Sequence, residues 1–207
     1  KQAYLNDLFA ELYTPQTHVY AIAGMDNPVH YRNKVISPFA PAKHGHKKPQ
    51  NKQSKQRGAA STQPEILTGM YARGTHRLIT TDGCLVENET ANKIVQVIRA
   101  IMDKYHMEPY NEDTGEGFMR HVVVRVGHTS NEVLVTLVTN KDEFKGAKNF
   151  CRELVARVPK ITTIVQNVNT RQTNVILGDG IERTLYGPGF ILDLSLIHIS
   201  EPTRRTP

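Results

Sequence analysis

The sequence predicts an α+β fold in which helices cover one face of an antiparallel sheet. From residue 92 onward, the expected elements follow in the order helix, strand, strand, helix, strand. Residues 120–126 and 132–138 are rich in β-branched side chains, and the turn-forming residues 127–131 join them. This arrangement predicts an antiparallel hairpin. The two helices carry apolar residues at helical spacing, so each has one face to bury against the sheet.

The clearest helix is expected at residues 92–105, where the apolar side chains form one continuous stripe. A second helix is expected to open at Asn140, because Asn140 and Glu143 have the spacing of a capping box, and to stop at Pro159. A short helix is also expected at residues 3–13. The remaining strands are predicted at residues 30–39, 66–73, 77–81, 161–168 and 181–186.

The chain is expected to divide into four parts. Residues 1–41 supply an N-terminal helix and the first strand, 42–64 form a basic mobile loop, and 65–193 form the α+β domain proper. Residues 194–207 look like the translation of a transposon adapter, so we interpret them as an artefact and give them no functional role. The biological chain is then expected to be cut off near Asp193, and the missing initiator Met indicates a start inside a longer protein.

Composition favours a soluble, cytoplasmic protein. Hydrophobic residues make up 39% of the 207 residues, which is enough for a core, and no run approaches the roughly 18 apolar residues of a membrane span. The two cysteines cannot form a disulfide framework, and alone they cannot supply a metal site of four thiolates.

The positive charge is concentrated in one segment. Residues 41–60 contain six basic side chains and no acid, which accounts for the whole net charge of +6. The segment reads either as a solvated surface insertion or as an arm that contacts a polyanion. Nucleic acid is the favoured partner, because cations that neutralise phosphates release counterions and no amphipathic membrane helix accompanies the segment. The candidate RNA-binding residues of this loop are Lys43, Lys47, Lys48, Lys52, Lys55 and Arg57.

Six short blocks follow one another in a characteristic order. They are GMDNPVHYRNK (24–34), GMYARGTH (69–76), DGCLVE (82–87), GFMRHVVVR (117–125), NVN with NVILG (167–169 and 174–178), and LYG (185–187). Together they resemble the central region of the RNA uracil-C5 methyltransferases that depend on S-adenosylmethionine, and within that family the 23S ribosomal RNA branch. The resemblance covers residues 1–193.

The resemblance implies a covalent reaction. In this family, a cysteine thiolate adds to C6 of uracil, C5 takes the methyl group from the sulfonium, and a carboxylate removes the C5 proton. The target base must first leave its stack. The glycine-rich cofactor loop, the nucleophilic Cys and the basic Glu of the doubly wound C-terminal domain match no position here. We therefore assign no catalytic residue and no residue that binds S-adenosylmethionine.

The resemblance also suggests a role for Cys84. In the iron–sulfur members of the family, three cysteines precede the region that this chain matches, and a fourth lies in a block like DGCLVE. Cys84 matches that fourth ligand of a 4Fe-4S cluster, in which each iron needs a protein thiolate. The alternative is a buried free thiol. Cys151 lies on the apolar face of a predicted helix and is interpreted as a core residue.

Candidate RNA contacts combine cations with aromatic rings, a pairing that suits single-stranded RNA. Arg32 and Lys34 share one face of a predicted strand. Tyr71 and Arg73 share a face of the next strand, with His76 at the following turn. Arg120 and His121 flank an apolar run, and either of them is a candidate contact. The asparagines at 167, 169 and 174 are interpreted as turn or edge residues that bind backbone groups.

These observations lead to one hypothesis with two rivals. The chain is expected to be a fragment of a 23S ribosomal RNA uracil-C5 methyltransferase, inactive alone, which holds ribosomal RNA. The first rival is the transfer RNA uracil-C5 methyltransferase, and the cysteine at position 84 favours the ribosomal branch. The second rival is an RNA-binding module without catalysis.

Overall fold

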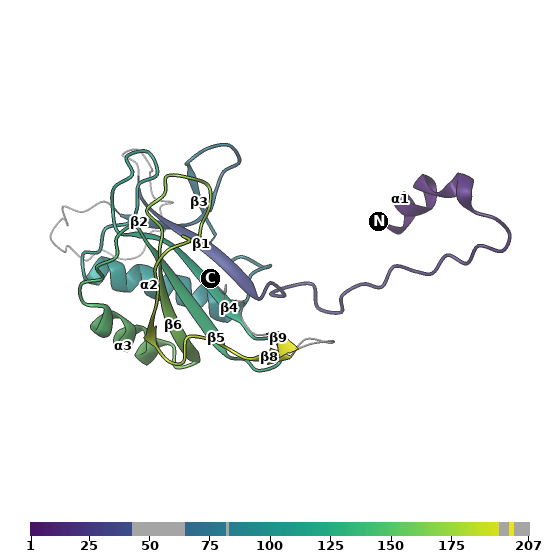
Figure 1. The fold of residues 1–207 in the computed structure, drawn as a ribbon. Helices are drawn as coiled ribbons and strands as arrows, with labels where there is room; N and C mark the ends of the chain where they lie inside the picture. The colour runs from purple at the N-terminus through teal and green to yellow at the C-terminus, as the bar shows by residue number, and fades with distance from the viewer. Residues whose placement is uncertain (43–64, 82, 195–198, 201–207) are drawn as a thin grey trace, which may run out of the picture.

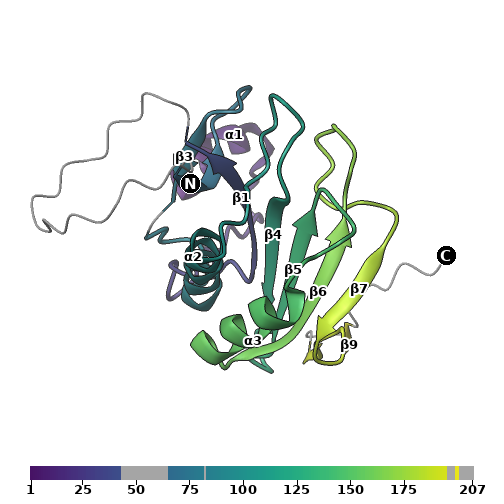
Figure 2. The same ribbon diagram turned by 90° about the vertical axis from the view of Figure 1, so that its left-hand side faces the viewer.

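The computed structural model describes residues 1–42, 65–81, 83–194 and 199–200. Its centre is a seven-stranded sheet with the strand order β3-β2-β1-β4-β5-β6-β7 (Figure 1). The strands are β1 (Lys34–Pro41), β2 (Ile66–Tyr71), β3 (Leu78–Thr80), β4 (Met119–Val126), β5 (Val133–Thr139), β6 (Ile161–Val168) and β7 (Glu182–Tyr186). Two longer helices, α2 (Glu89–Lys104) and α3 (Ala147–Arg157), pack on one side of this sheet (Figure 2). The predicted α+β class is therefore confirmed.

The sheet is antiparallel except at one place. The predicted hairpin of β4 and β5 forms, with Val124 opposite Val135. In contrast, β5 and β6 run parallel, because α3 lies between them in the chain and carries it back to the end of the sheet where β5 began. A parallel neighbour requires such a crossover. The expectation of a wholly antiparallel sheet was wrong for this pair.

Two of the element boundaries that differ from the prediction have a clear physical cause. The first strand begins at Lys34 rather than at residue 30, because the preceding residues pair elsewhere: the His30 amide donates to the Leu85 carbonyl (2.7 Å) and the Arg32 amide to Val86 (3.0 Å). The predicted capping box at Asn140 was also wrong. Helix α3 begins at Ala147, after Gly146 in the left-handed region.

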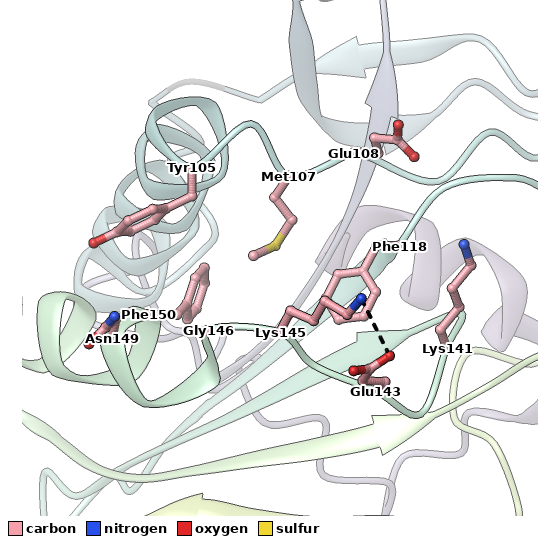
Figure 3. A pocket seen from close by; sticks show the side chains of 10 residues that line it. All are labelled: Tyr105, Met107, Glu108, Phe118, Lys141, Glu143, Lys145, Gly146, Asn149 and Phe150. Atoms are coloured by element: carbon pink, nitrogen blue, oxygen red, sulfur yellow. Dashed lines mark ion pairs between the residues drawn. The ribbon is translucent and has the colours of Figure 1, made fainter.

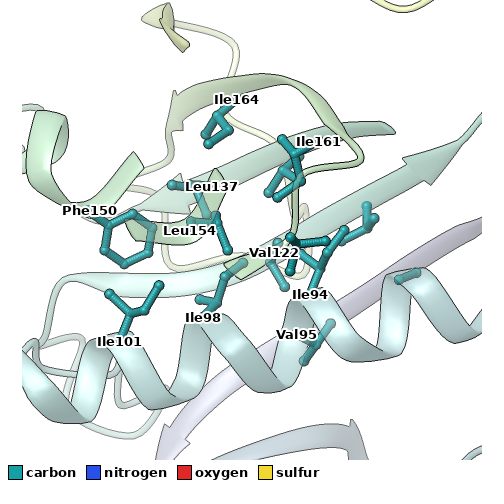
Figure 4. Close-up of a cluster of buried hydrophobic side chains, with 14 of the residues drawn as sticks. Ile94, Val95, Ile98, Ile101, Val122, Leu137, Phe150, Leu154, Ile161 and Ile164 are labelled. Atoms are coloured by element: carbon teal, nitrogen blue, oxygen red, sulfur yellow. The ribbon is translucent and has the colours of Figure 1, made fainter. Parts of the chain in front are cut away.

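The main core lies between the two helices and the sheet (Figure 4). The stripe predicted on α2 is buried, with Ile94, Ile98 and Ile101 fully covered. From α3, Phe150, Cys151 and Leu154 join them, so the interpretation of Cys151 as a core residue is confirmed. Burial raises the pKa of the Cys151 thiol to about 11, which keeps it protonated at neutral pH.

The N-terminal part stands apart from the sheet. Helix α1 (Gln2–Leu8) and a 3-10 turn (Ala10–Leu12) occupy much of the region where a helix was predicted, but neither has a buried residue. Figure 1 shows this segment at the end of an extended stretch, away from the body of the molecule. A small ribbon of β8 (Asp193–Leu194) and β9 (Ile199–Ser200) lies near the other end of the chain. None of the helices in the described residues is long and apolar enough to span a membrane.

Candidate nucleic-acid interface

Arg120 is the centre of a polar cluster at one end of the sheet. The pairing of β4 with β5 is irregular between Met119 and His121, and Arg120 lies at this irregularity. Its Nη1 donates to the carbonyl oxygens of Asn169 (2.8 Å) and Arg171 (2.7 Å). The side chain is only 1% exposed. Arg120 therefore ties the start of β4 to the loop that follows β6.

The Arg120 guanidinium also contacts the loop of residues 108–118. Its carbon lies 4.2 Å from the centre of the Tyr110 ring, a cation–π contact, and its Nη2 is 3.8 Å from the Glu112 carboxylate. Among the described residues, Nε of Arg120 has no hydrogen-bond partner. The charge is thus buried but balanced by an aromatic face, two carbonyls and one carboxylate.

Tyr71 and His76 complete the cluster from the β2–β3 hairpin. Nδ1 of His76 is 2.8 Å from Oδ1 of Asp113, and both side chains are about half exposed. The ring centres of Tyr71 and His76 are 6.3 Å apart. Burial, followed by the nearby Glu112 charge, raises the pKa of the Tyr71 phenol well above its usual range. Tyr71 is therefore a neutral phenol at neutral pH, next to a half-exposed His–Asp pair.

The structure brings three of the sequence-predicted residues together, namely Tyr71, His76 and Arg120. Arg73 lies on the exposed turn after β2, close in sequence to both Tyr71 and His76. Sequence reasoning missed Tyr110, Glu112 and Asp113. No local motif marks these three residues, and only the long-range packing of the 108–118 loop places them next to the hairpin.

Arg32 and Lys34 lie elsewhere, although both are exposed. Lys34 pairs with Arg125 at the opposite end of β4, five residues from Arg120. That separation is roughly 17 Å along the strand. The predicted RNA contacts Arg32 and Lys34 therefore do not share one patch with the Arg120 cluster.

His121 differs from an exposed contact residue. It is 8% exposed, and its Nδ1 has no hydrogen-bond partner among the described residues. Burial, helped by the neighbouring Arg120 charge, lowers the pKa of His121 to about 4. At neutral pH the ring is uncharged. Like Arg120, it offers almost no surface to an RNA in this conformation.

Two asparagines hold the loop after β6. The Asn167 side chain exchanges two hydrogen bonds with Gly178, accepting from its amide (2.7 Å) and donating to its carbonyl (3.2 Å). Asn169 donates to the carbonyls of Val175 and Ile176 (2.7 and 2.9 Å). The interpretation of these two residues as binders of backbone groups is confirmed. Asn174 is exposed on the same loop.

Cys84 lies just before α2 and is partly exposed, with its amide donating to the Thr81 carbonyl (3.2 Å). The part of the chain that the structure describes contains no group of three or more His, Cys, Asp or Glu side chains placed to hold a metal. These residues alone therefore do not fit a 4Fe-4S cluster, which needs four thiolates. The six basic residues predicted at positions 43–57 lie outside the described residues.

Comparisons with known proteins bear on this arrangement. The sequence matches no protein-family model. It is 33% identical over 179 residues to an uncharacterized RNA methyltransferase of Oceanobacillus iheyensis, covering 86% of this chain and 34% of that protein. An uncharacterized RNA methyltransferase of Listeria monocytogenes serotype 4b is 35% identical over 170 residues. This match covers 82% of the present chain and 33% of the Listeria protein. The chain thus spans about a third of the length of these relatives.

The fold also has a counterpart among solved structures. The tRNA (uracil-54, C5)-methyltransferase of Pyrococcus abyssi, in complex with S-adenosyl-L-homocysteine, matches with a TM-score of 0.57 and 20% identity. The match covers 82% of this chain and 34% of that one. At this level of identity the likeness supports the fold. The evidence for the family of this chain comes from the sequence relatives.

Proposed function

The chain belongs to a family of RNA methyltransferases, and from this premise we propose that it positions RNA for methylation of a uridine at C5. The methyl group would come from S-adenosylmethionine, which supplies an electrophilic carbon when bound. No strand-to-helix connection among the described residues is a glycine-rich turn of the kind that holds nucleotide cofactors. The described residues therefore do not fit that cofactor.

One observation carries this proposal. The similarity to RNA methyltransferases extends over 86% of the chain, and the six motif blocks span residues 24–187. Two of these blocks supply Tyr71, His76 and Arg120, which meet in one cluster. Arg73 and Arg77 are exposed on the turn beside it. Cations next to aromatic rings suit single-stranded RNA, whose bases stack while its phosphates pair.

We further propose that the RNA is 23S ribosomal RNA and that the protein acts in the cytoplasm. The support is Cys84, whose block resembles the one that carries the fourth cluster ligand in the ribosomal branch. In a longer protein of the relatives' length, Cys84 would supply one thiolate and cysteines from outside this chain the other three. Transfer RNA is the second candidate substrate, because the structural neighbour is named as a tRNA uracil-54 methyltransferase.

Binding and methyl transfer test the proposal separately. We expect the chain to bind a single-stranded, uridine-containing RNA with affinity that falls steeply with salt. Arg73→Ala/Arg77→Ala should weaken binding several-fold, whereas Arg183→Ala, which removes an exposed arginine paired with Asp142, should not. The chain alone should not methylate the RNA. Salt-independent binding would contradict the RNA-positioning role, and methylation by this chain alone would contradict the assignment of the chemistry to another part of the protein.

A further inference from the structure

A second candidate site lies on the helix-covered side of the sheet (Figure 3). It is a pocket of about 510 Å³, bounded by the residues after α2, the end of the 108–118 loop and the first turn of α3. Its volume falls within the roughly 300–1,000 Å³ that is usual for small-molecule sites. The residues that matter most are Tyr105, Phe118, Lys141 and Lys145.

Aromatic side chains form the fixed part of this pocket. Phe118 contacts Phe144 edge to face, with ring centres 5.0 Å apart, and Phe144 in turn contacts the buried Phe150 at 5.4 Å. Tyr105 is 44% exposed, and its hydroxyl donates to Glu153 (2.7 Å). Because neighbours hold these rings, a base that stacks on them does not have to order them first.

Charged side chains form the exposed rim of the pocket. Lys141 and Lys145 are both exposed, and Figure 3 shows Lys141 across the pocket from Tyr105, with Phe118 between them. Lys145 is 3.8 Å from Glu143, but both side chains are largely exposed, so this ion pair is weak. Lys145 can therefore exchange Glu143 for a phosphate. The Glu143 carboxylate is then free to accept an N–H group of a base.

The place of the pocket in the fold supports this reading. It lies at the carboxyl end of β5, the first strand of the parallel β5–α3–β6 unit, where ligands commonly bind in α/β sheets. The 108–118 loop connects it to the Arg120 cluster. Asn140, directly after β5, donates to the carbonyls of Gly115 and Gly117 (3.2 Å each) and holds that loop in place.

We propose that this pocket binds one unstacked nucleotide of a single-stranded RNA segment. Its base would stack on Phe118 and Tyr105, and its phosphate would pair with Lys141 and Lys145. The proposal rests on the proposed function, because the same RNA supplies the nucleotide. It adds a second contact region, separate from the exposed turn at Arg73.

The test measures the dissociation constant of a fluorescein-labelled ten-nucleotide oligouridylate. We expect Phe118→Leu, which keeps an apolar side chain, to weaken binding about five- to thirtyfold through lost stacking. Lys141→Ala/Lys145→Ala removes only exposed side chains and should weaken it about three- to tenfold. The matched control, Lys93→Ala/Lys160→Ala, removes two exposed lysines far from the pocket and should leave the constant unchanged. Ultraviolet crosslinking of the same RNA, substituted with 5-bromouridine, should label the peptides that contain Tyr105 or Phe118.

The outcomes separate this inference from the broader proposal. If both pocket variants bind like the unaltered chain and crosslinks fall only on peptides of residues 65–81, the pocket is not a nucleotide site, while the RNA-positioning role stands. If Lys141→Ala/Lys145→Ala and Lys93→Ala/Lys160→Ala weaken binding equally, the loss of affinity comes from the lowered net charge of the chain. That result overturns the pocket inference. If the unaltered chain does not bind the oligonucleotide, both proposals fail.

Discussion

Arg120 is a buried charged side chain that stabilises the fold instead of contacting solvent. Its guanidinium satisfies two carbonyls of the loop after β6 and lies on the Tyr110 ring. We expect Arg120→Met, which keeps the length and loses the donors, to lower the free energy of unfolding by about 2–4 kcal/mol. Urea denaturation at pH 7 measures this. Arg183→Met, at an exposed ion pair, should change it by less than about 1 kcal/mol, and equal effects of the two variants would contradict the buried role.

His121 predicts a specific dependence of stability on pH. Its folded-state pKa of about 4 lies below the roughly 6.5 of an unfolded chain. Between these values the unfolded state binds more protons, so His121 costs no stability above about pH 6.5 and progressively more as the pH falls towards 4. The loss reaches on the order of 3 kcal/mol.

The matching measurement compares unfolding free energies at pH 7.5, 6 and 5 in His121→Leu and in the unaltered chain. Leucine does not titrate, so the variant should lose less stability between pH 6.5 and 5. His128→Leu alters an exposed histidine in the β4–β5 turn and should keep the full loss. Parallel pH curves for His121→Leu and the unaltered chain would show that His121 titrates normally.

At the scale of elements, the 108–118 loop requires a glycine at position 117. Gly117 has a φ of 108°, and a Cβ there would overlap the carbonyl oxygen of Pro109. We expect Gly117→Ala to lower the free energy of unfolding by about 2 kcal/mol or more. Gly24→Ala, where a Cβ meets open space, is the control and should be nearly neutral. A neutral Gly117→Ala in thermal or urea unfolding would mean that the loop rearranges freely.

The elements that the sequence predicted well are those with strong local patterns. The α2 stripe and the β4–β5 hairpin needed only periodicity and a turn, and both formed. The start of α3 was missed because the Asn140 side chain binds the carbonyls of Gly115 and Gly117 instead of capping a helix. The parallel pairing of β5 with β6 was missed, although the predicted order of strand, helix and strand is that of a crossover unit, whose two strands run parallel.

The same limit applies to the candidate site. Motif order singled out Tyr71, His76 and Arg120, which do come together. Their acidic partners Glu112 and Asp113 come from a loop with no motif of its own. The burial of Arg120 was also invisible in the sequence, because a basic residue beside an apolar run is equally compatible with a strand end in water. The burial is explained by hydrogen bonds to the carbonyls of Asn169 and Arg171, which lie 49 and 51 residues away along the chain.

At the scale of the whole molecule, the net positive charge is concentrated in residues 43–57. The six basic residues at positions 43–57 equal the whole net charge of +6, so the rest of the chain is balanced overall. An RNA that meets the rest of the chain therefore gains little long-range attraction from its net charge. Affinity there must come from local contacts, and stacking in the aromatic pocket depends less on salt than contacts from cations to phosphates do.

This division predicts different salt responses for two sets of variants. Replacing the six basic residues of 43–57 with Gln should reduce the slope of log affinity against log salt by up to about 4, since each phosphate contact on single-stranded RNA contributes about 0.7. Phe118→Leu should weaken binding at every salt concentration and leave the slope unchanged, because stacking releases no counterions. Binding titrations of one oligouridylate between 50 and 300 mM KCl, at about pH 7, measure both quantities. An unchanged slope in the Gln variant would remove the segment from the interface, and a reduced slope in Phe118→Leu would show that the pocket acts through charge instead of stacking.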